Sequence, residues 1–323
     1  MDLEPTDDQV ALAAGVARLC ADRVTPEARR AAAERPGAVD RDLWRALGDM
    51  GVFALAIPED RGGLGLGMAE ATLVFEELGR AAVPGPLVGT FLAAGLPVEI
   101  ARAALAGEAV VGLQPAGAPL FVEHHDALDA LLVVGPGGVT VTGRPDAGEG
   151  PLDRPLDPLT PVEVVAALPP GEPVGDPALA ARVRRDAGLL AAALQVGLAG
   201  AAVAMATGHA TSRVQFGRVI GSFQALKHLL ADAQVGVEVA RAAVNAAGVA
   251  ADEGGEDAGR AADAARIVAS RAADRATRTC IQVHGGMGFT WDLDAHLLLK
   301  RAMVLDATVG GPDEAVDSLA AAL

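Results

Sequence analysis

The sequence contains no tyrosine, only two cysteines and few aromatic residues of any kind. Cys20 and Cys280 are too few for a disulfide framework or a cysteine-rich metal site. A chain with this cysteine content is expected in a reducing cytoplasm. Aromatic residues make up 3% of the chain, whereas alanine, glycine and leucine are abundant. This composition argues against an aromatic-rich β-sandwich and favours helices that pack closely through small side chains.

Basic residues are also scarce, with 26 lysines and arginines against 42 aspartates and glutamates and a formal net charge of −16. An acidic protein repels phosphate backbones, which argues against nucleic acid as the main partner. Segment 1–8 is acidic where a secretory signal needs a basic stretch followed by an apolar run. The apolar stretch 187–206 consists mostly of alanine and glycine and contains Gln195. We therefore predict a buried bundle helix there and no membrane span.

Apolar residues make up 51% of the chain and the mean hydropathy is +0.32, which is enough for a large core. The length of 323 residues suggests about two domains. Apolar residues recur at helical spacing in the first third of the chain and again after residue 178. Between these two parts lie short β-type runs that are separated by glycine and proline. Helices are expected over 6–34, 40–50, 68–82, 87–105, 179–211, 223–253, 257–284 and 292–305.

The predicted fold class is mainly α with a small β-domain. A helical N-terminal domain (1–107) is followed by a shortened β-domain with its linker (108–177) and by a four-helix bundle (178–323). The β-domain is expected to hold a small, mainly antiparallel sheet, and the Pro- and Gly-rich stretch 169–177 is read as a linker. The expected strands lie at 110–113, 130–134, 139–141 and 162–166.

Two glycine-containing stretches have side chains suited to a nucleotide-like ligand. In stretch 212–232 a long helix ends and a turn leads into the next, exposing Arg213 and Phe216. An arginine offers a planar fork of donors for a pyrophosphate, and a phenylalanine can pack on a ring. The second stretch, 282–292, contains three glycines that let a ligand approach the backbone. Each stretch taken alone is equally compatible with a capped turn between helices.

The two stretches together, in this order and separated by two helices, resemble the C-terminal bundle of the acyl-CoA dehydrogenase family. Segments 51–67 and 74–81 resemble the signature of the first domain of that family. The resemblance implies a flavoprotein of helical domain, β-domain and helical bundle, usually assembled as a tetramer. It also implies FAD-dependent α,β-dehydrogenation of an acyl-CoA thioester, with electrons passed to an electron-transfer flavoprotein.

In that family the FAD lies across a subunit interface, and the neighbouring subunit donates an arginine, an aromatic residue and a Gln-x-x-Gly-Gly loop. The resemblance carries these cofactor-binding roles to positions that are all intact in this sequence. They are Arg213, Phe216, Gln282, Gly285 and Gly286.

The catalytic glutamate of the family has no counterpart here. Its two usual positions fall on Ala187 and Gly310, neither of which can accept a proton. Asp186 adjoins the first of them, but one residue along a helix turns a side chain by about 100°. Asp186 is therefore a weak candidate base, and the catalytic residue stays unassigned.

The middle section also departs from the family, because it offers only stretch 113–117 against a flavin and contains no tryptophan. The pattern is similar to the silent half of heteromeric acyl-CoA dehydrogenases of actinobacterial steroid side-chain degradation. It implies a homologous active partner in a heterodimer or heterotetramer, and a role in lipid or steroid metabolism. Two alternatives stay open, namely a homo-oligomeric dehydrogenase with Asp186 as a relocated base and a non-catalytic scaffold with this fold.

No metal site is predicted. The run His124, His125 and Asp126 resembles a pair of metal ligands, but no third ligand is evident from the sequence. Adjacent histidines on a short loop are more often solvated, so we expect these two side chains to face water.

Overall fold

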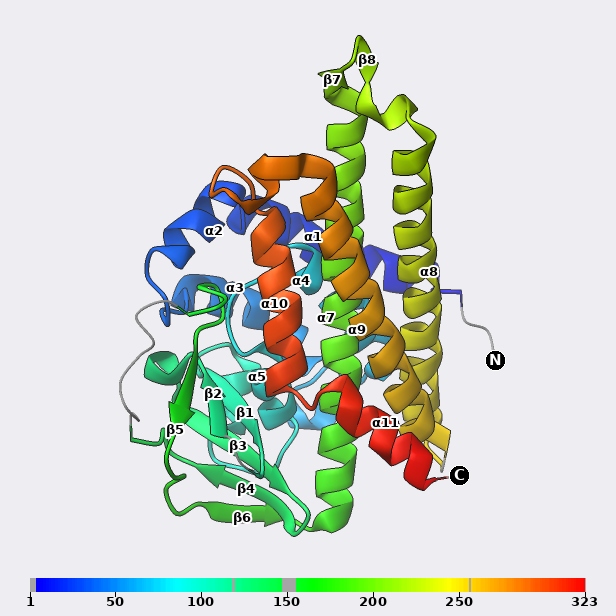
Figure 1. Ribbon diagram of the computed structural model, residues 1–323. Coiled ribbons are helices and arrows are strands. Elements are labelled where there is room, and N and C mark those ends of the chain that lie inside the picture. Colours follow the sequence, from blue (N-terminus) through cyan, green and yellow to red (C-terminus); the bar gives the residue numbers. More distant parts are fainter. Residues whose placement is uncertain (1–3, 118–119, 147–154, 256, 323) are drawn as a thin grey trace.

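The computed structural model describes residues 4–117, 120–146, 155–255 and 257–322. Residues 1–3 and 147–154, which the sequence assigns to the first and second predicted domains, lie outside the described residues, as do 118–119, 256 and 323. The chain forms a helical region, a small sheet and a group of long helices in that order (Figure 1). This is the predicted fold class.

The N-terminal region is helical, but two of its predicted helices are each divided. Segment 6–34 forms two helices because Thr25 caps a new helix that Pro26 begins. Segment 87–105 is likewise divided, with Pro97 lying between its two helices. The elements are α1 (Asp7–Arg23), α2 (Pro26–Ala33), α3 (Arg41–Asp49), η1 (Val52–Ala54), η2 (Glu59–Arg61), α4 (Met68–Arg80), α5 (Leu87–Ala94) and α6 (Ala101–Leu105).

The sheet region contains a four-stranded sheet of order β1-β3-β4-β6 and a separate pair, β2 with β5. All pairings are antiparallel except that of β1 with β3. The sequence missed β2 and β6, and the reading of 169–177 as a linker is wrong where β6 pairs with β4. Pro173 is tolerated there because β6 is an edge strand. The strands are β1 (Val111–Pro115), β2 (Leu120–Glu123), β3 (Ala130–Gly135), β4 (Gly138–Thr142), β5 (Val162–Val165) and β6 (Glu172–Gly175), with η3 (His125–Ala127) following β2.

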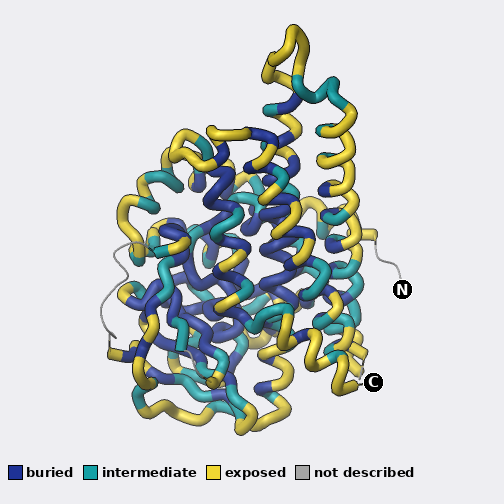
Figure 2. The backbone as a smooth tube through the Cα atoms, in the orientation of Figure 1, coloured by how far each residue is buried: buried dark blue, intermediate teal, exposed yellow. Residues whose placement is uncertain are grey.

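The C-terminal part is built on one central helix, α7 (Pro177–Ser212). By length and composition α7 could cross a membrane, but 78% of its most apolar window is buried inside the protein, so it is a core helix. Figure 2 shows this burial along its middle. The remaining elements are β7 (Val214–Gln215), β8 (Arg218–Val219), η4 (Ile220–Ser222), α8 (Gln224–Glu253), α9 (Asp257–His284), η5 (Gly285–Phe289), α10 (Ala295–Thr308) and α11 (Pro312–Ala321). Helix α11 was not predicted.

Two glycines let α4 and α7 pack backbone against backbone. A Cβ added at Gly79 would overlap the carbonyl group of Leu194, and one at Gly197 would overlap the carbonyl of Glu76. The helices can therefore approach this closely only if both positions lack a side chain. This contact fixes the N-terminal helices against the bundle.

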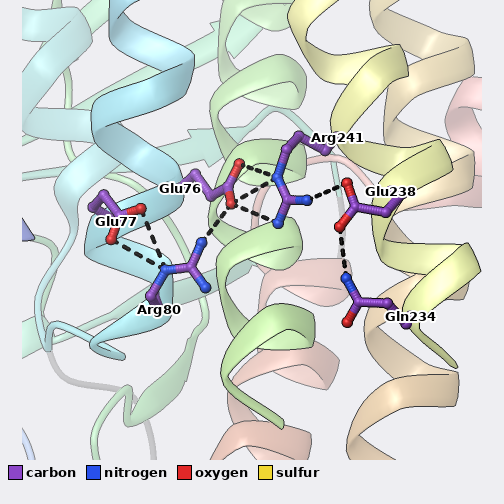
Figure 3. A network of polar contacts seen from close by, with 6 residues as sticks. All are labelled: Glu76, Glu77, Arg80, Gln234, Glu238 and Arg241. Atoms are coloured by element: carbon purple, nitrogen blue, oxygen red, sulfur yellow. Dashed lines mark hydrogen bonds and ion pairs between the residues drawn. The ribbon is translucent and has the colours of Figure 1, made fainter. Parts of the chain in front are cut away.

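A network of polar contacts joins the same two parts of the molecule (Figure 3). The buried carboxylate of Glu76 on α4 accepts hydrogen bonds from Arg80 Nη2 at 2.7 Å and from Arg241 Nε on α8 at 3.0 Å. The Arg241 guanidinium also pairs with Glu238 Oε2 at 2.6 Å. The buried charge of Glu76 is thus shared between two arginines, as a buried carboxylate requires.

Candidate functional site

A cavity of about 400 Å³ lies between α7, α9 and the connection from α10 to α11. Ala187 of α7 and Gly310 of the connection both line it. The two positions at which the resemblance expects a catalytic glutamate are 123 residues apart in the sequence, yet they converge on one space. A glutamate from either position would reach this cavity, and neither position supplies one.

A buried arginine holds the wall of the cavity in place. Arg266 of α9 donates from Nε to the carbonyl of Gly310 at 3.1 Å and from Nη2 to the carbonyl of Leu305 at 2.9 Å. Its Nη1 contacts Gln195 of α7 and lies 3.2 Å from the carboxylate of Asp306. Burial lowers the pKa of Arg266, and Asp306 opposes that shift. Gln195, the lone amide in an apolar run, therefore helps to fix the Gly310 loop.

Two carboxylates that the sequence analysis did not single out line the same cavity. Glu314 lies in the first turn of α11, and its Oε2 is 3.4 Å from the point where a Cβ at Gly310 would stand. Asp263 of α9 also lines the cavity, and burial raises the pKa of its carboxyl group while Ser318 opposes the rise. The local signal for α11 was Pro312 followed by two acidic residues, which is a typical helix start.

Asp186 faces a different cavity of about 400 Å³, between α7 and the N-terminal helices. Arg185 binds its carboxylate at 2.6 Å. Burial raises the pKa of Asp186, and Arg185 opposes the rise. The two cavities share Val183 and Arg185 in their walls. Asp186 thus lines the neighbouring cavity, whereas Ala187 and Gly310 line the first, in keeping with the change of direction between successive helical residues.

Arg213 and Phe216 lie at the other end of α7. Arg213 caps the helix, and β7 and β8 then form a short hairpin that projects beyond the rest of the molecule (Figure 1). Phe216 at the hairpin turn is 90% exposed and has a φ of 53°. A bulky side chain is costly in this left-handed conformation and gains no burial here. Its ring lies edge-on to that of Phe223, with ring centroids 6.2 Å apart.

The glycine loop is at the same end of the bundle. His209 of α7 and His284 of α9 stack with ring centroids 4.3 Å apart, which joins the two helix ends. Gln282 is exposed, and the loop begins at Gly285 with a φ of 61° that favours glycine. Gly286 does not have a positive φ, and a Cβ added there would meet open space. Nothing within the described residues requires glycine at this position, whereas a ligand laid against the backbone would.

The predicted cofactor-binding residues therefore gather at one end of the molecule, and the cavity with Ala187 and Gly310 is at the other. From Ala187 to Arg213 the helix extends roughly 39 Å at about 1.5 Å per residue. The five residues fit a flavin dinucleotide by their chemistry: an exposed guanidinium, an exposed ring, an exposed amide and two open glycines. They all lie at the surface of this chain.

The sheet side offers less room. A small cavity of about 150 Å³ beside Gly310 is lined by Gln114 and Phe121. The Oε1 of Gln114 is buried there without a hydrogen-bond partner. Sites for cofactor-sized ligands usually measure about 300–1,000 Å³. Among the described residues, this small cavity thus provides one unpaired acceptor and is by itself too small for a flavin ring system.

The histidine pair is not solvated, and the sequence expectation is wrong on this point. His124 is 1% exposed and His125 is 3% exposed. The reason is that β2 pairs with β5, which the sequence did not predict, and this pairing carries the following turn into the interior. It also brings Glu163 of β5 within reach of His125 and Asp126.

A helical N-terminal region, a small sheet and a bundle with a cavity at one end and a projecting hairpin at the other define the architecture of an acyl-CoA dehydrogenase. The sequence agrees with the fold. The acyl-CoA dehydrogenase N-terminal domain family matches residues 6–104, and the acyl-CoA dehydrogenase C-terminal domain family matches residues 187–322. The chain belongs to the acyl-CoA dehydrogenase family of flavoprotein oxidoreductases.

A similar protein is the acyl-CoA dehydrogenase IpdE2 of Mycobacterium tuberculosis, which is 37% identical over 93% of this chain and 92% of its own length. Among solved structures, the ChsE4-ChsE5 complex from Mycobacterium tuberculosis has a TM-score of 0.84 at 24% identity, covering 99% of this chain and 98% of the matched chain. The Tcur3481-Tcur3483 steroid ACAD has a TM-score of 0.85 at 24% identity, covering 97% of each chain. At these identities the two structures show a common fold.

Proposed function

We propose that this chain is a subunit of a heteromeric, FAD-dependent acyl-CoA dehydrogenase that completes the cofactor site of a homologous, catalytically active partner. The observation that carries the proposal is the division of the molecule. Groups suited to FAD lie at the projecting end of α7, whereas the cavity at the other end has Ala187 and Gly310 where a base would be needed.

In this proposal Arg213 binds the pyrophosphate of FAD, and Phe216 packs on the cofactor. Gln282 supplies hydrogen bonds, while Gly285 and Gly286 let the cofactor approach the backbone. When bound, FAD supplies the hydride acceptor for α,β-dehydrogenation of the acyl-CoA thioester. The residues of this chain orient the cofactor, and the carboxylate that removes the α-proton comes from the partner.

The proposal extends to partners, substrate and location. Similarity to the ChsE4-ChsE5 complex and to a steroid ACAD supports assembly with a homologous subunit, in a heterodimer or heterotetramer, and a lipid or steroid acyl-CoA as substrate. An electron-transfer flavoprotein would accept the electrons. Both cysteines are free, which supports a cytoplasmic location.

The proposal is tested by purifying the chain alone and after co-expression with a homologous acyl-CoA dehydrogenase subunit from the same genome. We expect a yellow complex that reduces an artificial electron acceptor with acyl-CoA, and no activity from this chain by itself. Arg213→Ala should lower the FAD content of the complex at least about tenfold, because a charge-assisted contact is lost. Arg45→Ala, an exposed arginine on α3, is the matched control and should change nothing. A colourless chain that never associates with a homologue would contradict the proposal and favour a non-catalytic scaffold.

One observation favours a second function, in which the chain is active by itself with a relocated base. The carboxylate of Glu314 lies beside the position where a side chain at Gly310 would begin, and it faces the same cavity. A base supplied one helical turn later in the sequence could reach the same substrate atom. Asp186, the candidate from the sequence, is less suited because it lines the neighbouring cavity and is paired with Arg185.

Three variants of the purified chain, alone and in the complex, separate these functions. If the second function holds, Glu314→Gln lowers kcat at least about 100-fold, as expected for loss of a general base. Asp186→Asn and Asp263→Asn then retain activity within about threefold. Full activity of a complex that contains Glu314→Gln eliminates the second function and leaves the heteromeric one.

A further inference from the structure

Three potential metal ligands meet where β2 and β5 pair. His125 and Asp126 lie in η3, directly after β2, and Glu163 lies on β5 opposite Val122. One ligand atom from each of the three side chains lies within 4.8 Å of the other two. The group lies outside the two cavities that contain Ala187 and Asp186 and has no part in the proposed dehydrogenase chemistry.

The hydrogen bond at Nε2 of His125 leaves a lone pair on the other ring nitrogen, Nδ1. Nε2 lies 2.8 Å from the carbonyl oxygen of Pro145, and because a carbonyl only accepts, Nε2 carries the proton. Metal-binding histidines usually bind a carbonyl or carboxylate through one ring nitrogen in this way and the metal through the other. This arrangement directs the Nδ1 lone pair toward the carboxylates of Asp126 and Glu163.

The distances fit a shared cation better than a shared proton. Nδ1 is 3.3 Å from Asp126 Oδ1 and 3.6 Å from Glu163 Oε2. A protonated imidazole would donate to a carboxylate at about 2.7–2.9 Å. Ligand atoms at about 2.0–2.1 Å from a tetrahedral zinc lie about 3.3 Å from one another. The two distances from Nδ1 match the second case, and all three ligand atoms lie within 4.8 Å of one another.

Burial and charge support the same conclusion. The side chains of His125 and Glu163 are nine-tenths or more buried, and within the described residues His125 is the one ion-pair partner of the Glu163 carboxylate. Two carboxylates and a neutral imidazole would carry a charge of −2, which a divalent cation would balance. Arg144 lies nearby, but within the described residues its Nη1 donates to the main-chain carbonyl of Asp126 and not to either carboxylate. Asp126 is largely exposed, so an ion can enter from solvent.

We propose that His125 Nδ1, Asp126 and Glu163 bind a divalent metal ion of the Zn²⁺ class, with water as the remaining ligand. The ion would connect the turn after β2 to β5 and, through the hydrogen bond to Pro145, to the segment after β4. This role is structural. The sequence predicted no metal site, because Glu163 becomes a neighbour of His125 only through the pairing of β2 with β5.

The test uses the full-length, untagged chain, treated with EDTA and dialysed, then titrated with ZnCl₂ by calorimetry. We expect one Zn²⁺ to bind through this site and to raise the midpoint of thermal unfolding. Asp126→Asn and Glu163→Gln should each weaken binding at least about tenfold. Asp146→Asn, an exposed carboxylate on the segment that contains Pro145, is the matched control and should bind like the parent. Since Asp126 is exposed, its variant should fold even if the Glu163 variant does not.

A second measurement reports on the ligand itself. Co²⁺ in place of Zn²⁺ should give the visible absorption of a tetrahedral site, and His125→Gln should abolish it. The proposal is overturned if the parent chain binds no Zn²⁺, if Asp126→Asn and Glu163→Gln bind it undiminished, or if nitrogen NMR finds His125 doubly protonated with Zn²⁺ present.

Discussion

At the scale of single residues, burial controls the chemistry of the two cysteines. Burial, with a smaller effect of Glu77, raises the pKa of Cys20 to about 12, and burial raises the pKa of Cys280 to about 12. Only the thiolate reacts with alkylating agents, and at pH 8 roughly one thiol in ten thousand would be ionised at such a pKa.

We therefore expect the native protein to resist iodoacetamide at pH 8, and both thiols to react once the chain is unfolded, as measured by mass spectrometry. Rapid alkylation of the native protein would contradict the burial of these side chains.

The raised pKa values of the two thiols also make the stability of the protein depend on pH. Unfolded thiols ionise above about pH 9 while the folded ones stay protonated, so the free energy of unfolding should fall as pH rises from 9 toward 12.

Residues in short motifs were predictable, whereas those that meet only through folding were not. Arg213 and Gly285 belong to stretches that are recognisable along the sequence itself. Glu314 was not predictable as a neighbour of Gly310, because this contact depends on the unpredicted helix α11. The contact of Glu163 with His125 was not predictable either, because the two residues are 38 positions apart in the sequence and meet only through folding.

At the scale of elements, the long helices were predictable and the short strands were less so. Helices α8 and α9 have nearly the predicted bounds because apolar residues recur at helical spacing over many turns. Strands β2 and β6 have four residues each, too few for a period to be evident. Their existence depends on the partner strands β5 and β4, which is information that a local pattern does not contain.

The glycines of α7 are not equivalent, and this gives a test of the helix contact. Gly197→Ala should destabilise the protein by about 3 kcal/mol, because its Cβ would overlap the backbone of α4 at Glu76. Gly208→Ala in the same helix has open space and should stabilise it by about 0.5–1 kcal/mol. Urea unfolding of both variants measures the difference. Equal shifts in the same direction would contradict the close contact of α4 with α7.

The network around Glu76 gives a second test at this scale (Figure 3). Glu76→Gln should cost about 2 kcal/mol, because two arginines lose a mostly buried carboxylate. Glu238→Gln, which removes an exposed partner of the same Arg241, should cost less than about 0.5 kcal/mol. Chemical unfolding at low and moderate salt checks both values. If Glu238→Gln cost as much as Glu76→Gln or more, Glu76 would not be the main stabilising carboxylate of this network.

At the scale of the whole molecule, the hairpin is expected to contribute to association and not to folding. Val214 is 55% exposed and Phe216 is 90% exposed, so replacing both with serine removes apolar surface that the chain itself does not bury. The double variant should unfold within about 0.5 kcal/mol of the parent. It should bind the partner subunit at least about tenfold more weakly, as expected for a loss of apolar contacts at an interface.

Val10→Ser on α1, which is also 55% exposed, is the matched control and should leave both quantities unchanged. Sedimentation of the purified chains, alone and mixed, measures the association. Partner binding that survived the double variant would show that the hairpin is not part of the interface.

Helix α7 makes the two ends of this molecule mechanically connected but chemically independent. The residues at the Arg213 end share no side-chain contact, within the described parts of the chain, with the residues around Gly310. A substitution at one end can therefore leave the side chains at the other end in place. If the proposed heteromeric function holds, a duplicated copy could lose its base and still be retained, because its partner would depend on the opposite end. The length of a single helix would then be what allows one enzyme to be divided between two genes.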